Sequence, residues 1–439
     1  MNQDVKNAAI LAALERACRR AQEVTASSGQ IPREDAEILR RSPHGLQIAT
    51  EKRVDWQRFS AKITRFSGWW DEMAHLVKVL RKDVDVELIV GFDPDVGIRA
   101  QTIWRDILDP LLQQYQLIKG DWTWDPAVAS ELVNSWRQAQ NRKSYGRQTL
   151  APLHNCKSMA EPLEVEPGLV IRQFTDEDRN DLWRAFGAEH FPGPINPTIP
   201  DLEMWETVID YRWRLPQKPP LSNEPAVEVI RDTVRALRLH HGGVTGTTII
   251  WQRPDPTEAF PESMLGGSLF APLGTGPGLF MDRLASQVGP NCASPIRALL
   301  QALRAAGGEK RLNLAIRRLD AAYLRLDPED RLIDLWIAFE ALLLPDMSGE
   351  LSYRAATRIA QLVGHTATEK RAAFNSARRS YTRRSQVVHG RTAEEDLGEV
   401  VEETRELARQ AIRSWLLEAP RDVRSLDDAV FGEDPDPAR

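Results

Sequence analysis

Residues 381–390 read YTRRSQVVHG and bring together a permanent cation and a side chain that transfers protons near neutral pH. Arg384 carries a planar guanidinium that binds phosphate, and His389 follows after four intervening residues. His389 can accept the proton of a ribose 2′-hydroxyl or protonate the leaving oxygen, while Arg384 neutralises the charge that builds on phosphorus. This pair is therefore the minimum equipment for cleaving a ribose phosphodiester without a metal.

The geometry of the pair leaves three arrangements open. Each residue of a regular helix turns by about 100°, so Arg384 and His389 lie ~140° apart. The helix can unwind in its last turn before Gly390, or the long arginine side chain can bend across. Alternatively, two subunits pair this helix and complete the site between them. Tyr381, Ser385 and His389 share one helix face more closely, at intervals of four.

This stretch is locally basic in an acidic chain. The 439 residues include 57 Lys and Arg against 63 Asp and Glu, a net charge of −6, which argues against a protein that coats a polyanion nonspecifically. RNA contact is therefore expected to be local. The expected RNA-binding residues are Arg378, Arg379, Arg383 and Arg391.

Outward from this stretch, the chain is predicted to be helical almost throughout, because apolar residues recur three and four positions apart. The predicted helices are 296–306, 310–324, 330–344, 352–363, 368–388 and 394–417. The acidic segment 421–439 has little to bury and is predicted to be a frayed tail.

These residues resemble the Apea-like branch of the HEPN superfamily (higher eukaryotes and prokaryotes nucleotide-binding). The motif of that branch is matched by Tyr381, Arg384, Ser385, Val388, His389 and Gly390. Residues 335–342 (LWIAFEAL) resemble its apolar helix with a single glutamate, here Glu340. Residues 350–356 (ELSYRAA) resemble the following helix, whose arginine is Arg354.

The resemblance covers about 120 residues and implies a bundle that forms a homodimer with its Arg/His pairs near the axis. Active members of the superfamily are metal-independent endoribonucleases that leave a 2′,3′-cyclic phosphate and a 5′-hydroxyl, and many act in bacterial antiphage defence, abortive infection or toxin systems. It implies that His389 is the acid/base, that Arg384 stabilises charge, and that Ser385 and Tyr381 orient groups. The alternative is a non-catalytic module that binds RNA or nucleotide, or dimerises, as a sensor or regulator.

Two further residues have roles that the sequence leaves open. Glu340 lies in a very apolar helix, so it needs a partner if it is buried, and Arg354 or Arg384 are the candidates; otherwise it faces water. Arg354 is interpreted as a structural ion-pair partner.

The whole chain is predicted to be α+β and multidomain. Residues 1–150 form a mainly helical region of unknown role, 151–292 a mixed α/β region, 293–420 the all-α HEPN-like bundle, and 421–439 the tail. The N-terminal region can be a sensor for a phage or regulatory protein trigger. In it, helices are predicted at 5–24 and 98–118, a strand at 84–90, and a linker at 138–147.

In the middle region, strands are predicted at 163–165 and 169–171 around a Pro-Gly turn, then a helix capped by Thr175 with Asp178 three residues later. Many prolines predict surface loop around a helix at 201–213. A helix at 227–240 is predicted to end at Gly242, followed by strands at 247–251 and 268–271.

Other motifs favour ordinary structure over chemistry. The glycine-rich stretches 242–248 and 274–278 lack the P-loop lysine and are interpreted as turns, and Asp93 with Asp95 as a solvated turn rather than a cation site. His240 and His241 have no Asp, Glu or Cys at metal-ligand spacing and fit a helix end better than a metal site. The basic and aromatic residues between 137 and 147 fit a solvated linker better than an RNA contact.

No metal and no cofactor are expected. The three cysteines (Cys18, Cys156 and Cys292) are far apart and fit reduced thiols in a cytoplasm. No long apolar span and no basic, then apolar, N-terminus is present, so neither a membrane span nor a secretory signal is expected.

Overall fold

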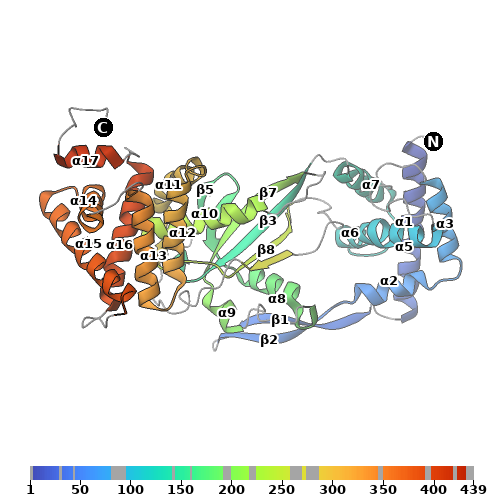
Figure 1. The fold of residues 1–439 in the computed structure, drawn as a ribbon. Helices are drawn as coiled ribbons and strands as arrows, with labels where there is room; N and C mark the ends of the chain where they lie inside the picture. Colours follow the sequence, from blue (N-terminus) through green and yellow to red (C-terminus); the bar gives the residue numbers. More distant parts are fainter. Residues whose placement is uncertain are drawn as a thin grey trace.

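A computed structural model of the chain describes residues 3–28, 32–42, 45–80, 95–140, 144–158, 161–190, 199–216, 224–257, 269–272, 286–344, 350–390, 397–418 and 423–431. N-terminal helices, a central sheet and a C-terminal helical bundle follow one another along an elongated molecule (Figure 1). This mixed α/β architecture with a helical C-terminal part agrees with the multidomain α+β layout that the sequence predicts. Within the described residues, no helix is long and apolar enough to cross a membrane.

The N-terminal helices enclose their own core. They are α1 (Gln3–Ser28), α2 (Trp56–Thr64), α3 (Trp69–Val79), α5 (Val96–Ile103), the π-helical turn η1 (Trp104–Leu108), α6 (Asp109–Lys119) and α7 (Pro126–Gln140). The rings of Trp69 and Trp104 meet edge to face at 4.9 Å inside this core. The helices predicted at 5–24 and 98–118 are confirmed, whereas the strand predicted at 84–90 and Asp93 lie outside the described residues.

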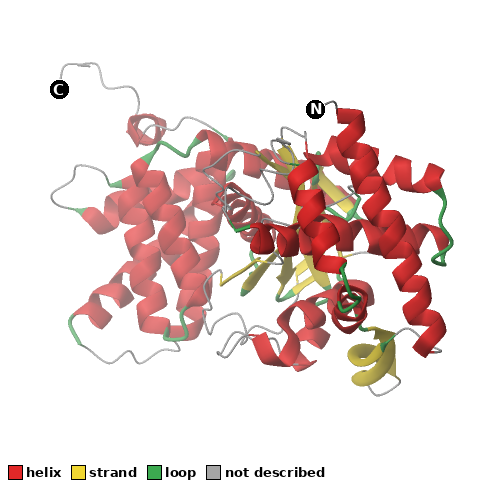
Figure 2. Cartoon of the chain, turned by 90° about the vertical axis from the view of Figure 1, so that its right-hand side faces the viewer, coloured by secondary structure: helices red, strands yellow, loops and turns green. Residues whose placement is uncertain are grey.

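A hairpin, β1 (Arg33–Ser42) with β2 (Gly45–Val54), leaves these helices and reaches the middle of the molecule; Figure 2 shows it apart from the main sheet. The side-chain amide of Asn180 accepts from the Leu39 N–H at 2.7 Å and donates to the Leu39 carbonyl at 2.9 Å. Asn180 therefore completes the outer edge of β1 as a neighbouring strand would, and joins the N-terminal part to the middle one.

Among the described residues, the main sheet has six strands, with antiparallel neighbours, in the order β5-β6-β7-β3-β8-β9. The strands are β3 (Ser144–Leu153), β5 (Leu163–Glu166), β6 (Leu169–Gln173), β7 (Thr207–Pro216), β8 (Ile249–Pro254) and β9 (Leu269–Pro272). A short parallel pair, β4 (Cys156–Ser158) with β10 (Ser286–Val288), lies beside it. The four short strands predicted from the sequence are confirmed as β5, β6, β8 and β9.

Two predictions for this region are wrong. The expected linker at 138–147 is instead the end of α7 and the start of β3, which pairs along its full length with β7. The helix expected at 201–213 is short, α9 (Ile199–Met204), and gives way to β7. Both strands hide polar residues by pairing them: Gln148 donates to Asp210 at 2.8 Å, and the Trp213 indole donates to Thr149 at 2.9 Å. The sequences of β3 and β7 are therefore as polar as those of surface segments, which is why neither was predicted as a strand.

The two faces of the sheet belong to different cores. Ala151, Ile209 and Ile250 pack toward α10 (Glu224–His241) and the C-terminal helices. Their chain neighbours Leu150 and Val208 pack on the opposite face, against α8 (Asp176–His190), α9 and the hairpin. This alternation is the period-two pattern of strands buried on both faces. The capping of α8 by Thr175 and Asp178 is confirmed, at 3.1 Å and 3.0 Å.

The C-terminal bundle confirms the six predicted helices. They are α11 (Ala293–Ala305), α12 (Lys310–Leu324), α13 (Pro328–Leu343), α14 (Leu351–Val363), α15 (Ala367–Val388) and α16 (Leu397–Leu417). The frayed tail is wrong for residues 423–431, which form α17 (Val423–Phe431). Leu426 is buried in the bundle core, and Asp427 pairs with the buried Arg358 at 2.6 Å. Apolar contacts of Leu426 and the partly buried Val423, together with this ion pair, therefore dock a segment whose composition is that of a tail.

The turn between β5 and β6 depends on a glycine. Gly168 has φ of +82°, and a Cβ there would lie 2.7 Å from the carbonyl oxygen of Arg212. Gly168→Ala is expected to lower the free energy of unfolding by about 1–3 kcal/mol, because the left-handed conformation strains an alanine. Urea denaturation measures this loss. Gly308→Ala is the control, since Gly308 has no atom within 4 Å of such a Cβ; equal losses in the two variants would contradict the prediction.

Candidate functional site

The residues of the 381–390 motif lie on the last turns of α15, packed against α13. Helix α15 starts with a capping box, in which Thr366 and Glu369 satisfy each other's backbone N–H groups. Helix α13 starts at Pro328, with Asp327 as its N-cap. These two local signals fix where each helix begins, and therefore which residues face each other farther along.

A buried polar chain holds the two helices in register. The Trp336 indole donates to the Ser380 hydroxyl at 2.8 Å, and that hydroxyl lies 2.7 Å from the Thr404 hydroxyl on α16. The Tyr381 ring stands edge to face on Trp336 at 4.9 Å. Tyr381 is therefore oriented by a fully buried tryptophan, which makes its position rigid.

Arg384 lies one turn after Tyr381 and pairs with Glu340 of α13, with Nη2 at 3.3 Å from Oε1. Both side chains are partly exposed, at 24% and 31%. The guanidinium carbon also lies 5.9 Å from the centroid of the Tyr381 ring, and Nε is buried with no hydrogen-bond partner among the described residues. Of the two cations that the sequence offers to Glu340, the structure selects Arg384. Arg354 is exposed on α14.

His389 is the first residue after α15, and its side chain is exposed. Its backbone N–H reaches the carbonyls of Ser385 and Gln386, each at 3.2 Å, and Gly390 leaves the helix with φ of +67°. Within the described part of the chain, no hydrogen bond or ion pair joins His389 to Arg384. The structure thus places Arg384, Tyr381 and Glu340 together, with His389 beyond them at the helix end and Ser385 half-buried between.

The predicted RNA-binding arginines differ in their surroundings. Arg378 is exposed and lies over the Phe374 ring at 6.0 Å, while Arg379 pairs with Glu403 on α16. Arg383 donates to Gln386 at 2.8 Å. Arg391 lies outside the described residues. Arg378 is therefore the best placed of the described three to meet a phosphate.

An open cleft of about 590 Å³ lies beside Tyr381 and Arg378, lined also by the start of α14. Tyr353 in this lining is 46% exposed, and its ring meets Phe374 edge to face at 5.5 Å. Exposed aromatic rings beside a cation are a surface on which nucleic-acid bases stack. The sequence interpretation missed Tyr353, although it lies next to Arg354 in the 350–356 segment.

The basic and aromatic residues between 137 and 147 that the structure describes are neither a solvated linker nor a surface patch. Arg137, Tyr145 and Arg147 are all buried, and Arg137 donates to Asn7 of α1 at 3.0 Å. Arg142 and Lys143 lie outside the described residues. Burial removes the described members of this group from contact with RNA.

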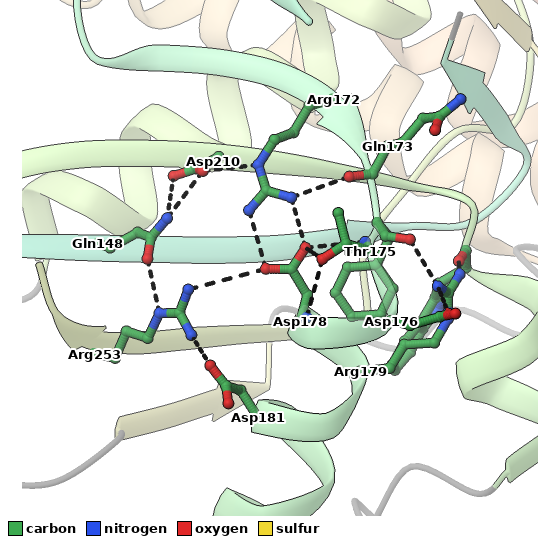
Figure 3. Close-up of polar contacts among 12 residues, drawn as sticks. Gln148, Arg172, Gln173, Thr175, Asp176, Asp178, Arg179, Asp181, Asp210 and Arg253 are labelled. Atoms are coloured by element: carbon green, nitrogen blue, oxygen red, sulfur yellow. Dashed lines mark hydrogen bonds and ion pairs between the residues drawn. The ribbon is translucent and has the colours of Figure 1, made fainter. Parts of the chain in front are cut away.

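A second polar cluster joins the sheet to α8 (Figure 3). Arg172 binds Asp178 at 2.5 Å and 3.0 Å and Asp210 at 2.9 Å, while Arg253 pairs with Asp181 and donates to Gln148 at 2.7 Å. Burial would raise the pKa of Asp178, but the bonds from Arg172 and from the Thr175 N–H and hydroxyl hold that pKa below its usual value. The charged groups of this cluster neutralise one another, so we interpret it as a structural contact that holds α8 against the sheet.

His240 and His241 end α10, as the sequence predicts, but they have a partner that spacing did not reveal. The chain brings Cys292 beside them at the start of α11, so the three side chains could hold a metal ion. The sequence spacing was read correctly, since Cys292 lies far along the chain, and only the fold brings it beside the histidines. Of the two glycine-rich stretches, 242–248 is an irregular loop in which Gly246 forms a β-bridge with His154, whereas 274–278 lies outside the described residues.

Comparison with protein-family models, with curated proteins and with solved structures finds no match to this chain.

Proposed function

We propose that this chain is a metal-independent endoribonuclease of the HEPN type, acting as a homodimer in bacterial antiphage defence by abortive infection or as a toxin-like protein. The observation that carries the proposal is the placement of Arg384 between Tyr381 and Glu340, with an exposed His389 five residues on at the end of the same helix. The match of residues 381–390 to the Apea-like motif supports the same activity.

In the proposed reaction, His389 accepts the proton of a ribose 2′-hydroxyl, and the 2′-oxygen attacks the adjacent phosphorus. The bond from phosphorus to the 5′-oxygen breaks, and that oxygen takes up the proton that the His389 imidazole accepted, so the imidazole is neutral again. The products are a 2′,3′-cyclic phosphate and a 5′-hydroxyl. Arg384 stabilises the extra negative charge on phosphorus, and Tyr381 and Glu340 hold its guanidinium in place.

Dimerisation supplies what one chain lacks, because Arg384 and His389 of one chain are not in contact. Val388, beside His389, is 53% exposed, so the end of α15 offers an apolar contact to a second copy. A pair of such helices around a two-fold axis would bring two arginines and two histidines to one phosphate. The N-terminal helices and hairpin are the proposed receiver of a phage or regulatory protein trigger.

The pairing of Arg384 with Glu340 favours a second candidate, a non-catalytic module that binds RNA or dimerises. A guanidinium whose charge is already neutralised by a carboxylate stabilises the extra negative charge on a phosphate less than a free one does. In this case Arg378, Tyr353 and Tyr381 bind RNA at the cleft without cleaving it.

The parent chain is expected to cut RNA in the presence of EDTA and to leave cyclic-phosphate ends. The matched substrate is the same RNA with 2′-O-methyl groups, which should remain intact because the attacking hydroxyl is blocked. Gel analysis and end-group mass spectrometry measure both results. Binding of both RNAs without cleavage, with and without a candidate protein trigger, would replace the nuclease with the binding module.

A further inference from the structure

Three potential metal ligands gather where the end of α10 meets the start of α11. One ligand atom from each of His240, His241 and Cys292 lies within 4.8 Å of the other two. The two imidazole rings have centroids 4.4 Å apart and planes inclined by 67°, so they meet edge to face rather than stacking. Two imidazole nitrogens and one thiolate sulfur are a donor set that suits zinc.

The backbone around the cluster is held firmly. Gly242 turns the chain out of α10 with φ of +78°, and a Cβ there would lie 3.1 Å from the Arg409 side chain. Arg409 donates to the carbonyls of Leu239 at 2.6 Å and His240 at 3.4 Å, which fixes the last turn of the helix. On the other side, Cys292 donates its N–H to Gly289 at 2.9 Å in the turn that begins α11. Ligands on a fixed backbone lose little freedom when a metal binds.

One imidazole of the cluster has a ring nitrogen that the described fold leaves unsatisfied. The Nε2 atom of His241 is buried and has no hydrogen-bond partner among the described residues. A buried nitrogen without a partner is costly, and a metal ion would satisfy it.

The charges of neighbouring residues do not prevent binding. Arg409 and Arg413 raise the local positive potential, but Arg409 forms an ion pair with Glu406. The thiolate of Cys292 adds a negative charge when it binds a metal. Cys292 is half-buried, so its thiol can be reached, whereas the other two cysteines are buried.

We propose that His240, His241 and Cys292 bind one zinc ion, which fastens the end of α10 to the start of α11. Three protein ligands leave the fourth tetrahedral position to water. This site is independent of the proposed ribonuclease activity, which uses neither of these helices for chemistry.

Cobalt titration of the full, tag-free chain tests the site after a chelator has removed bound metal. Co²⁺ is expected to bind at one equivalent and to produce a thiolate-to-cobalt charge-transfer band and intense visible bands of tetrahedral cobalt, which Zn²⁺ then abolishes. Cys292→Ala is expected to lose the charge-transfer band. His241→Gln should weaken Zn²⁺ binding at least about tenfold. Even the loss of a residue that only hydrogen-bonds to a metal ligand typically weakens metal affinity about 10- to 100-fold.

Two control variants remove the same chemical groups elsewhere. Cys18→Ala and His75→Gln, both in the N-terminal helices, should keep the band and the affinity. Protection of Cys292 from alkylation by Zn²⁺ provides a readout that needs no variant. A parent chain with native circular dichroism but no charge-transfer band, or a band that persists in Cys292→Ala, would overturn the proposal. Since no RNA is present, failure of cleavage has no bearing on this result.

Discussion

Replacing His389 by alanine is expected to reduce RNA cleavage about 100- to 10,000-fold, the range that a positioned acid/base contributes. The side chain is exposed and lies after the last helical residue, so its removal leaves no cavity and breaks no described hydrogen bond. The fold and the dimer should therefore survive. Cleavage rates on a labelled RNA measure the loss, and light scattering with circular dichroism checks assembly and folding.

His365→Ala is the matched control. His365 is an exposed histidine at the opposite end of α15, just before the Thr366 cap. Its removal takes away the same imidazole without touching the motif, so cleavage should continue at the parental rate. Equal losses in the two variants would indicate a general effect of histidine removal and would contradict a role for His389 in the reaction.

The relation between His389 and Arg384 provides a stricter test of the same prediction. Arg384→Ala should cost about 100- to 1,000-fold, as removal of a group that stabilises transition-state charge does. The effects of residues that act as one unit do not add. The double variant should therefore cleave RNA scarcely more slowly than the less active of the two single variants. If the rate losses of the two single variants instead multiply in the double variant, the two residues act independently. Arg384 would then be a cation that binds RNA and not part of one catalytic unit with His389.

The helices of the C-terminal bundle could be predicted because their signals are local. Apolar residues at helical spacing define each helix, and short motifs such as the Thr366–Glu369 capping box and Gly390 mark the ends. Helix α17 was not predicted because it is stabilised by contacts with distant parts of the chain and not by its own sequence pattern. The ion pair of Asp427 with Arg358 joins residues that are far apart in the sequence.

The central strands of the sheet could not be predicted for a similar reason. Gln148 and Thr149 are polar residues inside β3, yet both are buried, because their partners come from β7. Local hydrophobicity does not contain that information. A segment of this composition resembles a linker until the partner strand is known.

The residue types of the candidate site could be predicted from the sequence, but most of their contacts could not. Glu340 had two possible partners, and packing of α13 against α15 selects Arg384. Packing also brings Cys292 to His240 and His241, a grouping that no spacing rule describes because the residues lie on different elements. Tertiary contacts thus added both the ion pair and the potential metal ligands.

Asp178→Ala is expected to lower the free energy of unfolding by about 3–5 kcal/mol, the cost of removing one partner from a buried ion pair. The Asp178 carboxylate accepts bonds from Arg172 and from both the N–H and the hydroxyl of Thr175. Its loss would leave the Arg172 guanidinium mostly buried with Asp210 as its remaining carboxylate, and would remove half of the cap of α8 (Figure 3). Urea denaturation at pH 7 measures the change.

The same carboxylate should make stability depend on pH in one direction. The folded pKa of Asp178 lies below the value near 3.9 of an unfolded aspartate, so its stabilisation is complete above that value and declines as the pH falls through the folded pKa. The difference in urea midpoint between parent and Asp178→Ala should therefore shrink under acid conditions. Glu177→Ala, which removes an exposed carboxylate from the same first turn, should change the midpoint little at either pH. If Asp178→Ala lowers the free energy of unfolding by less than about 1 kcal/mol at pH 7, its ion pair is worth no more than a surface pair. Asp210 alone would then suffice to hold Arg172, which would contradict the prediction.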